Sequence, residues 1–233
     1  MNFISNLLET MERTSAGSED TARRVLSLCG GIAPKTALFV GDDCFTPLLI
    51  RQQTGAALTC AFTDAAHSEK ARAHGLDSRV VQLFEMPHIS GGYDLVWYSG
   101  TVEFDGISGR LEAVKDCLAR GGTAVYRTLC WLIDPSPDTE SYCTRRFGII
   151  EPLDRVLREA KEAGFRVQDF YIAPKTDWTE NYYRPLNRAA ADYQGLHSED
   201  GEIAAGMSEL KKETDMFTLH CEEYSYVYYI MKG

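Results

Sequence analysis

A glycine and two aspartates follow the first strongly apolar run of the chain, in the stretch ALFVGDD at 37–43. Gly41, Asp42 and Asp43 therefore stand where a strand would turn into a helix. Backbone N–H groups at such a turn attract anions, but two carboxylates beside them would repel a phosphate and tolerate a cationic amine or sulfonium. The alternative is a plain turn in which an aspartate caps the helix. The residues alone are compatible with both interpretations.

Other polar residues stand at the points where later apolar runs end. They are Asp64, Glu85, Tyr98 and Ser99. Ligands of open α/β sheets bind beyond the carboxyl ends of the strands, so we expect these residues to line one pocket with the glycine turn. For Glu85, a solvated loop carboxylate is an equally good interpretation.

A histidine and two aromatic residues are further candidates for chemistry. His88 has a side chain whose reference pKa suits a general base at neutral pH, although a loop histidine without a role is the alternative. Trp178 and Tyr182 are candidates for the wall of an acceptor pocket, because aromatic faces hold apolar groups and cations. The tyrosine alternation at 224–228 has a period of two, which is typical of a half-buried strand.

The elements that must position these residues alternate along the chain. Runs rich in β-branched and aromatic residues predict strands at 37–40, 57–62, 79–84, 93–99, 123–131, 165–172 and 223–231. Apolar periodicity and glycine stops predict helices at 2–12, 18–29, after Pro47, at 68–75, 110–122, 151–164 and within 185–218. A proline-bearing loop is expected at 134–139. The βαβα order and continuously apolar strands favour a sheet covered on both faces.

Several short phrases, taken with this order of elements, are similar to one family. The phrases are the strand and glycine turn at 37–41, a Gly17-to-Thr21 start, YDLVWYSG at 93–100, LARGG at 118–122, CWLIDPSP at 130–137 and DWTENYYRP at 177–185. Over most of its length the chain resembles class I S-adenosylmethionine-dependent methyltransferases. The resemblance implies a Rossmann-like α/β fold, with a seven-stranded, mostly parallel sheet and an antiparallel last strand. It also implies S-adenosylmethionine as cofactor, bound across the carboxyl ends of the first strands.

The resemblance assigns roles to residues already singled out by their positions. The cofactor-binding set is Gly41, Asp42, Asp64, Glu85 and Ser99, and the substrate-pocket set is Tyr98, Trp178 and Tyr182. No catalytic residue is identified, and no metal site is expected. Methyl transfer needs in-line alignment of an acceptor with the sulfonium, and no covalent intermediate with the protein.

Four positions depart from the family pattern. They are Phe39, Asp43, Phe45 and Phe62. The first replaces an acid and the next two replace glycines of the cofactor turn, which leaves Gly41 as its one glycine. Phe62 stands in place of the acid that accepts hydrogen bonds from the ribose, with Asp64 as a possible substitute. A Phe62→Asp variant is therefore expected, from the sequence, to bind the cofactor more strongly.

Composition limits the partners and the location. The formal net charge of −10 and the pI of about 5.0 disfavour nucleic acid and anionic membrane as partners. No secretory signal and no apolar run of about 20 residues are present, so the cytoplasm is the expected location. The seven cysteines are widely spaced and predict buried, reduced thiols. The length of 233 residues fits one domain. The resemblance implies that this methyltransferase-like domain covers 17–233, with residues 1–16 as an N-terminal helix or lid.

The function expected from the sequence is methyl transfer from S-adenosylmethionine to an unidentified small or moderate-sized acceptor. A second hypothesis is a catalytically inactive protein of the same fold that acts as a ligand sensor or interaction module. A nicotinamide-dependent reductase is the weaker third hypothesis, because the G-x-G-x-x-G fingerprint is absent. The sequence does not specify the acceptor, the pathway or the oligomeric state.

Overall fold

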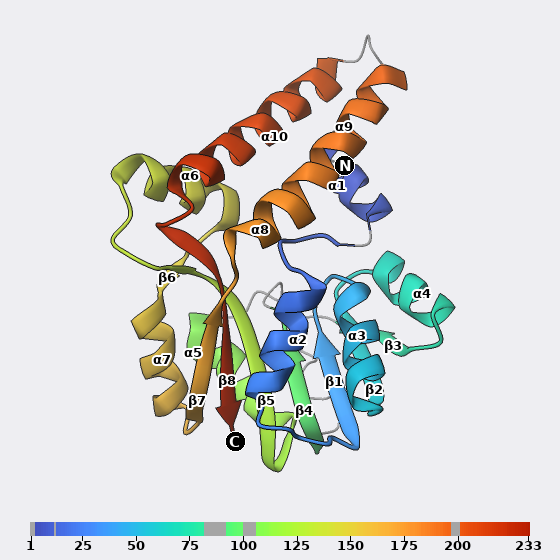
Figure 1. Ribbon diagram of the computed structural model, residues 1–233, viewed down its shortest axis with the longest axis vertical. Helices are drawn as coiled ribbons and strands as arrows, with labels where there is room; N and C mark the ends of the chain where they lie inside the picture. The colour runs from blue at the N-terminus through green and yellow to red at the C-terminus, as the bar shows by residue number, and fades with distance from the viewer. Residues whose placement is uncertain (1–2, 12, 82–91, 100–105, 197–200) are drawn as a thin grey trace.

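One sheet runs through the molecule in the order β3-β2-β1-β4-β5-β8-β7 (Figure 1). The computed structural model describes residues 3–11, 13–81, 92–99, 106–196 and 201–233. Its strands are β1 (Thr36–Val40), β2 (Ala57–Phe62), β3 (Asp77–Val80), β4 (Tyr93–Tyr98), β5 (Leu118–Trp131), β6 (Glu151–Pro152), β7 (Arg166–Ile172) and β8 (Tyr224–Lys232). β8 runs antiparallel to β5 and β7, while the other pairs are parallel. This confirms the predicted mostly parallel sheet with an antiparallel last strand; the short β6 beside β5 was not predicted.

Helices cover both faces of the sheet and one of its ends. They are α1 (Phe3–Thr10), α2 (Glu19–Leu28), α3 (Phe45–Thr54), α4 (Ala65–Ala73), α5 (Gly106–Asp116), α6 (Pro137–Phe147), α7 (Leu153–Glu162), α8 (Lys175–Trp178), the π-helical turn η2 (Thr179–Tyr183), α9 (Arg184–Leu196) and α10 (Gly201–His220). α2, α3 and α4 pack on one face, and α5 and α7 pack on the other. α1, α6 and α8 to α10 form a helical cap beyond the carboxyl ends of the central strands (Figure 1).

Strand periodicity decides which side chain belongs to which face. Leu38 and Val40 pack in the cluster with α5 and α7, while Ala37 and Phe39 pack in the cluster with α2 and α3. Successive side chains of a strand point to opposite faces, so a sheet covered on both sides needs apolar residues at every position. The apolar run of β1 therefore follows from its central place in the sheet.

Two segments differ from the sequence prediction. The helix expected over 110–122 ends at Asp116, and LARGG begins the long strand β5 instead. Gly121 has φ of 75°, so the double glycine forms an irregular strand start rather than a helix stop. The loop expected at 134–139 contains the start of α6. Ser136 is the N-cap residue of this helix, and Pro137 lies in its first turn. The strand expected at 79–84 is Asp77–Val80, and residues 82–84 lie outside the described part.

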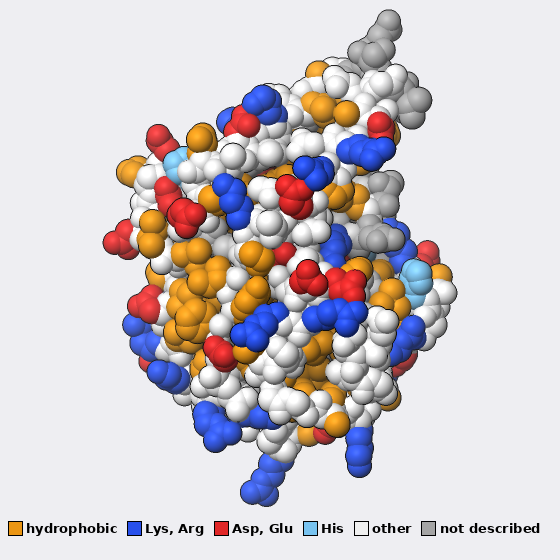
Figure 2. All heavy atoms as spheres, viewed as in Figure 1, with side chains coloured by type: hydrophobic (Ala, Val, Ile, Leu, Met, Phe, Trp, Pro, Cys, Tyr) orange, Lys and Arg blue, Asp and Glu red, His pale blue; other side chains and the backbone are white. Residues whose placement is uncertain are grey.

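Figure 2 shows acidic and basic side chains interspersed over the face that carries α2 and α3. Hydrophobic side chains gather on the same face over the β7 edge of the sheet. Within the described ranges, no helix is both long and apolar enough to cross a lipid bilayer.

The cysteines give a testable consequence of the packing. Six of the seven are buried and all are free thiols, and Cys221 is the one with intermediate exposure. Burial raises the pKa of Cys29 and of Cys60 to about 12, which suppresses the reactive thiolate. We expect Ellman's reagent to modify Cys221 rapidly and the other six slowly, at the rate of unfolding. Rapid modification of several thiols in the folded protein, or a Cys221→Ser variant with an unchanged fast phase, would contradict this.

Candidate functional site

The carboxyl ends of β1, β2 and β4 meet at one edge of the sheet. β1 pairs with both neighbours, so the three strands end side by side at Val40, Phe62 and Tyr98. The pairing continues one residue further, because Gly41 N–H donates to Ala61 O at 3.2 Å and Ser99 N–H donates to Val40 O at 2.8 Å. We call this region the carboxyl edge.

Gly41 is required at the carboxyl edge for close packing. It does not have a positive φ, so the turn does not demand glycine for its backbone conformation. A Cβ at this position would lie 2.7 Å from Phe39 Cζ and 2.9 Å from Ser99 Cβ. The structure thus brings Gly41 and Ser99 into contact, with the ring of Phe39 folded against the turn.

Two positions near the ends of β1 and β2 are acidic in the family that the sequence resembles. Buried aromatic residues occupy both positions here. Phe39 and Phe62 are fully buried, and their ring centroids lie 6.1 Å apart. Phe62 also stacks on the ring of His67 at 6.1 Å, with an interplanar angle of 22°. Neither strand end therefore offers a carboxylate at these positions.

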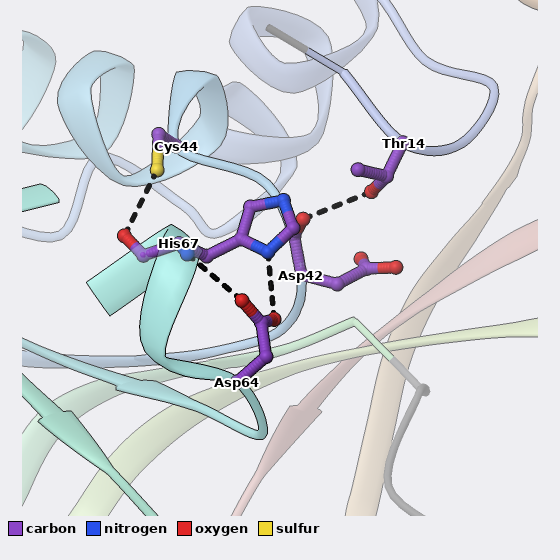
Figure 3. A network of polar contacts seen from close by, with 5 residues as sticks. All are labelled: Thr14, Asp42, Cys44, Asp64 and His67. Carbon is purple, nitrogen blue, oxygen red and sulfur yellow. Dashed lines mark hydrogen bonds and ion pairs between the residues drawn. The ribbon is translucent and has the colours of Figure 1, made fainter. Parts of the chain in front are cut away.

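Asp64 supplies the carboxylate closest in sequence to the end of β2. Its side chain accepts hydrogen bonds from His67 N–H at 2.9 Å and from His67 Nδ1 at 2.7 Å, so it caps α4 (Figure 3). The ring is thereby fixed with Nε2 directed away from Asp64, and Nε2 is buried with no hydrogen-bond partner. The Asp64 side chain stays 44% exposed, which leaves part of it accessible to a ligand.

The Asp64 cap has a pH-dependent contribution to stability. Burial opposes its charge, but the hydrogen bonds from His67 outweigh burial and lower the pKa of Asp64. A lowered folded-state pKa stabilises the fold above the unfolded pKa of about 3.9, and this contribution is lost as the pH falls through the folded value. Asp64→Ala should cost about 1 kcal/mol at pH 7, and the difference from wild type should shrink below about pH 4.

Urea unfolding at pH 7 and at acidic pH measures this prediction. Asp192→Ala, on an exposed position of α9, is the matched control and should show no such pH-dependent loss. An Asp64→Ala cost that is equal at both pH values would show that the cap does not depend on its charge.

The two aspartates of the turn have different surroundings. Asp43 is buried, and its Oδ1 accepts a hydrogen bond from Thr46 N–H at 2.6 Å in the first turn of α3, so it acts as a helix cap. The carbonyl of Asp42 accepts a hydrogen bond from Thr14 Oγ1 at 2.9 Å, whereas its carboxylate Oδ1 is buried without a partner. Burial raises the pKa of Asp42, and the neighbouring Asp43 raises it further.

Residues 13–18, which we call the strap, connect α1 to α2 and cross beyond the carboxyl edge (Figure 1). Arg127 of β5 holds the strap, because its guanidinium donates to Ser15 Oγ at 3.1 Å and to Ala16 O at 2.5 Å. Arg13 lies with its guanidinium carbon 3.7 Å from the ring centroid of Phe45, at the start of α3. The strap therefore covers part of the carboxyl edge.

A small polar void lies beneath the strap. It has a volume of about 10 Å³, and its walls include Arg13, Asp43, Thr46, Trp97, Ser99 and Arg127. Such a volume holds about one water molecule. Five buried polar atoms around the strap and the carboxyl edge lack a hydrogen-bond partner among the described residues: Asp42 Oδ1, His67 Nε2, Trp97 Nε1, Arg127 Nε and Asp177 Oδ2. Buried polar atoms without partners are uncommon, and their gathering here marks a place where a polar ligand or water would bind.

A larger hollow of about 250 Å³ lies between α3 and α4. Its lining residues include Met11, Cys44, Phe45, Leu48, His67 and His74. It adjoins the carboxyl edge through His67, so the two hollows flank the start of α3.

The residues expected to form a substrate pocket lie in two separate clusters. Tyr98 faces α5 and α7 and stacks on Tyr126 with ring centroids 5.3 Å apart. Trp178 and Tyr182 lie in the helical cap, where Trp178 stacks on Phe217 at 4.6 Å and donates its Nε1–H to Ser225 Oγ. The structure does not bring Tyr98 together with the other two, and all three are buried. Glu85 and His88 lie outside the described residues.

The sequence interpretation missed the residues that hold the strap. Arg127 is the clearest case, because a charged residue stood in the middle of the apolar run TAVYRTLCW. A buried charge in a strand costs free energy unless it has partners, so the position was itself a signal. Within the part of the chain that the structure describes, no cluster of three or more possible metal ligands occurs.

The fold is similar to that of solved S-adenosylmethionine-dependent methyltransferases. The enzyme from Thiobacillus denitrificans, in complex with S-adenosyl-L-homocysteine, has 14% identity and a TM-score of 0.81, with 99% of this chain and 98% of that chain covered. The enzyme from Geobacter sulfurreducens, in complex with the same ligand, has 13% identity and a TM-score of 0.81, with 99% and 98% covered. Phosphoethanolamine N-methyltransferase 2 from Haemonchus contortus has 12% identity and a TM-score of 0.73, with 98% of this chain and 57% of that chain covered.

These similarities establish the class I methyltransferase fold. No family model and no curated protein sequence matches the chain. Structural similarity at such low sequence identity establishes the fold, whereas function depends on the residues of the site.

The site can be compared with the chemistry of S-adenosylmethionine, which joins an adenosine and an amino-acid end through a cationic sulfonium. The unpartnered polar atoms around the strap suit a ligand with donors and acceptors. Asp64 is a partly exposed carboxylate just after β2. The residues fit such a ligand at these points, and Phe39 and Phe62 are where the fit is poorest.

Proposed function

We propose that this protein transfers a methyl group from S-adenosylmethionine to a small or moderate-sized acceptor. The observation that carries the proposal is the gathering of unpartnered buried polar atoms at the carboxyl edge and the strap. In an open α/β sheet, ligands bind at this edge. β1 and β4, two of the strands that end at this edge, are interior strands of the sheet.

The proposed site uses residues from three strand ends. The backbone at Gly41 and Ser99 lies at the carboxyl edge, and the partly exposed Asp64 supplies negative charge for a cationic ligand with hydroxyl groups. Asp42 adds a buried carboxyl group with an unpartnered oxygen. The bound cofactor would supply an electrophilic methyl group. The strap would exclude water from it, and positioning of the acceptor would account for much of the rate. Glu85 remains a predicted contact after β3.

The second candidate function is a ligand-binding protein without catalysis. Phe39 and Phe62 favour it, because both occupy strand-end positions with buried aromatic packing in place of acids. A sensor of this kind would bind a nucleoside or amino-acid ligand and transmit the change through the strap. Methyl transfer itself distinguishes the two candidates.

Isothermal titration calorimetry with S-adenosylhomocysteine tests the proposed cofactor. A charged hydrogen bond is worth about 1.5–3 kcal/mol, so the missing acid at Phe62 should weaken a micromolar ligand by about 10- to 100-fold. We expect a dissociation constant of about 10–100 µM. NADH and NADPH are the controls and should not bind. Absence of any S-adenosylhomocysteine binding would refute the proposal, and binding without transfer to any acceptor would favour the sensor.

A small-molecule acceptor is the expected partner. The similar structure from Haemonchus contortus is named as a phosphoethanolamine N-methyltransferase, which supports a small acceptor for this fold. The acidic net charge of −10 argues against nucleic acid and anionic lipid as acceptors. Cytoplasmic location stays a prediction from the sequence. Transfer of a labelled methyl group to a panel of small amines, acids and thiols would identify the acceptor class.

A further inference from the structure

Arg127 has unused hydrogen-bonding capacity although it is almost fully buried. Arg127 is only 3% exposed, and its guanidinium carbon lies 3.6 Å from the ring centroid of Tyr226. Two of its nitrogens donate to the strap, whereas Nε has no partner. Trp97 lines the same void, and its Nε1 is also buried without a partner. Two residues of one void therefore each carry a buried donor that has no hydrogen-bond partner among the described residues.

Positive side chains outnumber negative ones in the wall of the void. Arg13 and Arg127 both line it, and Asp43 is the one carboxylate in its wall. Two further acids lie nearby, Asp42 and Asp177, but burial raises the pKa of each, which disfavours their charged forms. Asp43 is already used as the cap of α3. One more negative charge would therefore be stabilised here.

We propose that Arg127, assisted by Arg13, binds the carboxylate of a small ligand beneath the strap. The planar guanidinium matches a carboxylate in a two-point contact, which is stronger than contacts with neutral acceptors. This inference rests on the proposed function for the position of the site. Two sources carry the required group: the amino-acid end of the cofactor, or a carboxylate on the methyl acceptor.

Binding requires the strap to move. The void holds about one water molecule, which is less than a carboxylate and the chain attached to it require, so the ligand must displace what the strap places there. Ser15 Oγ and Ala16 O are the present acceptors of Arg127, and a carboxylate offers two oxygens in their place. The ligand and the strap thus compete for the same guanidinium.

A pair of related nucleosides isolates the carboxylate. S-adenosylhomocysteine carries the amino-acid end, and 5′-methylthioadenosine lacks it. We expect the wild type to prefer S-adenosylhomocysteine, and Arg127→Gln to reduce that preference by about 10- to 100-fold. The ratio is measured within each variant by calorimetry, so a general loss of stability cancels. Arg127→Lys keeps the charge without the planar fork and should lose part of the preference.

Two further variants separate binding from structure. Ser15→Ala removes a competing acceptor, so it should strengthen S-adenosylhomocysteine binding by about two- to tenfold and leave 5′-methylthioadenosine unchanged. A purely structural role for the Arg127 contact predicts no such gain. Arg51→Gln is the matched control, because Arg51 also donates two hydrogen bonds to backbone carbonyls, but on the exposed side of α3. It should leave the ratio unchanged.

Acetate and glycine test the second source directly. If Arg127→Gln leaves the nucleoside ratio unchanged, millimolar acetate or glycine should still raise the melting temperature of the wild type and not that of Arg127→Gln. If the wild type binds neither nucleoside, the proposed cofactor is wrong. The melting temperatures with acetate and glycine then test by themselves whether Arg127 binds a carboxylate. An unchanged ratio together with equal responses of both proteins to acetate and glycine would overturn the inference.

Discussion

Phe62→Asp is expected to lower the free energy of unfolding by at least about 3–5 kcal/mol and to bring no gain in cofactor affinity. The Phe62 side chain is fully buried and packs between the rings of Phe39 and His67, with centroids 6.1 Å from each. Removing a buried aromatic ring costs this amount by itself. The new carboxylate would add a desolvation cost, because it would stand at a fully buried position.

Urea unfolding of Phe62→Asp and of Phe62→Leu measures this effect. The leucine variant keeps an apolar side chain and should lose much less stability, about 1–1.5 kcal/mol. The sequence alone predicted the opposite benefit, a restored ribose acceptor. A stable Phe62→Asp protein that binds S-adenosylhomocysteine more tightly than wild type would show that this side chain faces the ligand in the bound state.

The same contrast shows how far the sequence could define the site. Strand 57–62 was predicted with its observed bounds. The helix predicted at 18–29 begins with Ser18, which caps α2 by accepting a hydrogen bond from Thr21 N–H. Apolar run length and capping residues are local signals, so strands and helix ends can be predicted from them without knowledge of the tertiary structure. The mostly parallel sheet with an antiparallel last strand followed from the resemblance, and the observed pairing confirms it.

The face to which a residue points was harder to predict. Trp97 and Tyr98 are neighbours in β4, yet Trp97 lines the void under the strap while Tyr98 packs against Tyr126 on the opposite face. In a strand buried on both sides, apolar residues occupy every position, so the pattern does not mark which face is which. Tyr98 was therefore a natural candidate for the pocket, although its neighbour is the one that reaches the void.

The long-range contacts of the strap could also not be predicted from the sequence. Arg127 and Ala16 are separated by 111 residues, and their hydrogen bond exists because β5 and the strap meet at the carboxyl edge. The buried arginine in an apolar run could be noticed in the sequence, but its partners could not be named. α6 was missed for a different reason, since prolines around Ser136 resemble a loop until Pro137 is recognised as the first turn of a helix.

Gly41→Ala is expected to cost about 1–3 kcal/mol of stability, because the added methyl group overpacks the turn. Its Cβ would lie 2.7 Å from Phe39 Cζ and 2.9 Å from Ser99 Cβ, and both neighbours are buried. Since Gly41 does not have a positive φ, the backbone itself tolerates alanine. Gly195→Ala in α9 is the matched control: nothing lies within 4 Å of its Cβ, so it should stabilise by up to about 1 kcal/mol.

A double-mutant cycle with Phe39→Leu tests whether the ring of Phe39 is the cause of this cost. Leucine removes the atom that the new methyl group would meet, so Gly41→Ala should cost at least about 1 kcal/mol less in the Phe39→Leu background. Additive costs would place the conflict at Ser99 instead. The cycle also bears on the purpose of the glycine. If Gly41 serves only internal packing, the double variant should bind S-adenosylhomocysteine like Phe39→Leu, whereas a turn that must admit the cofactor closely would lose affinity even after its stability is restored.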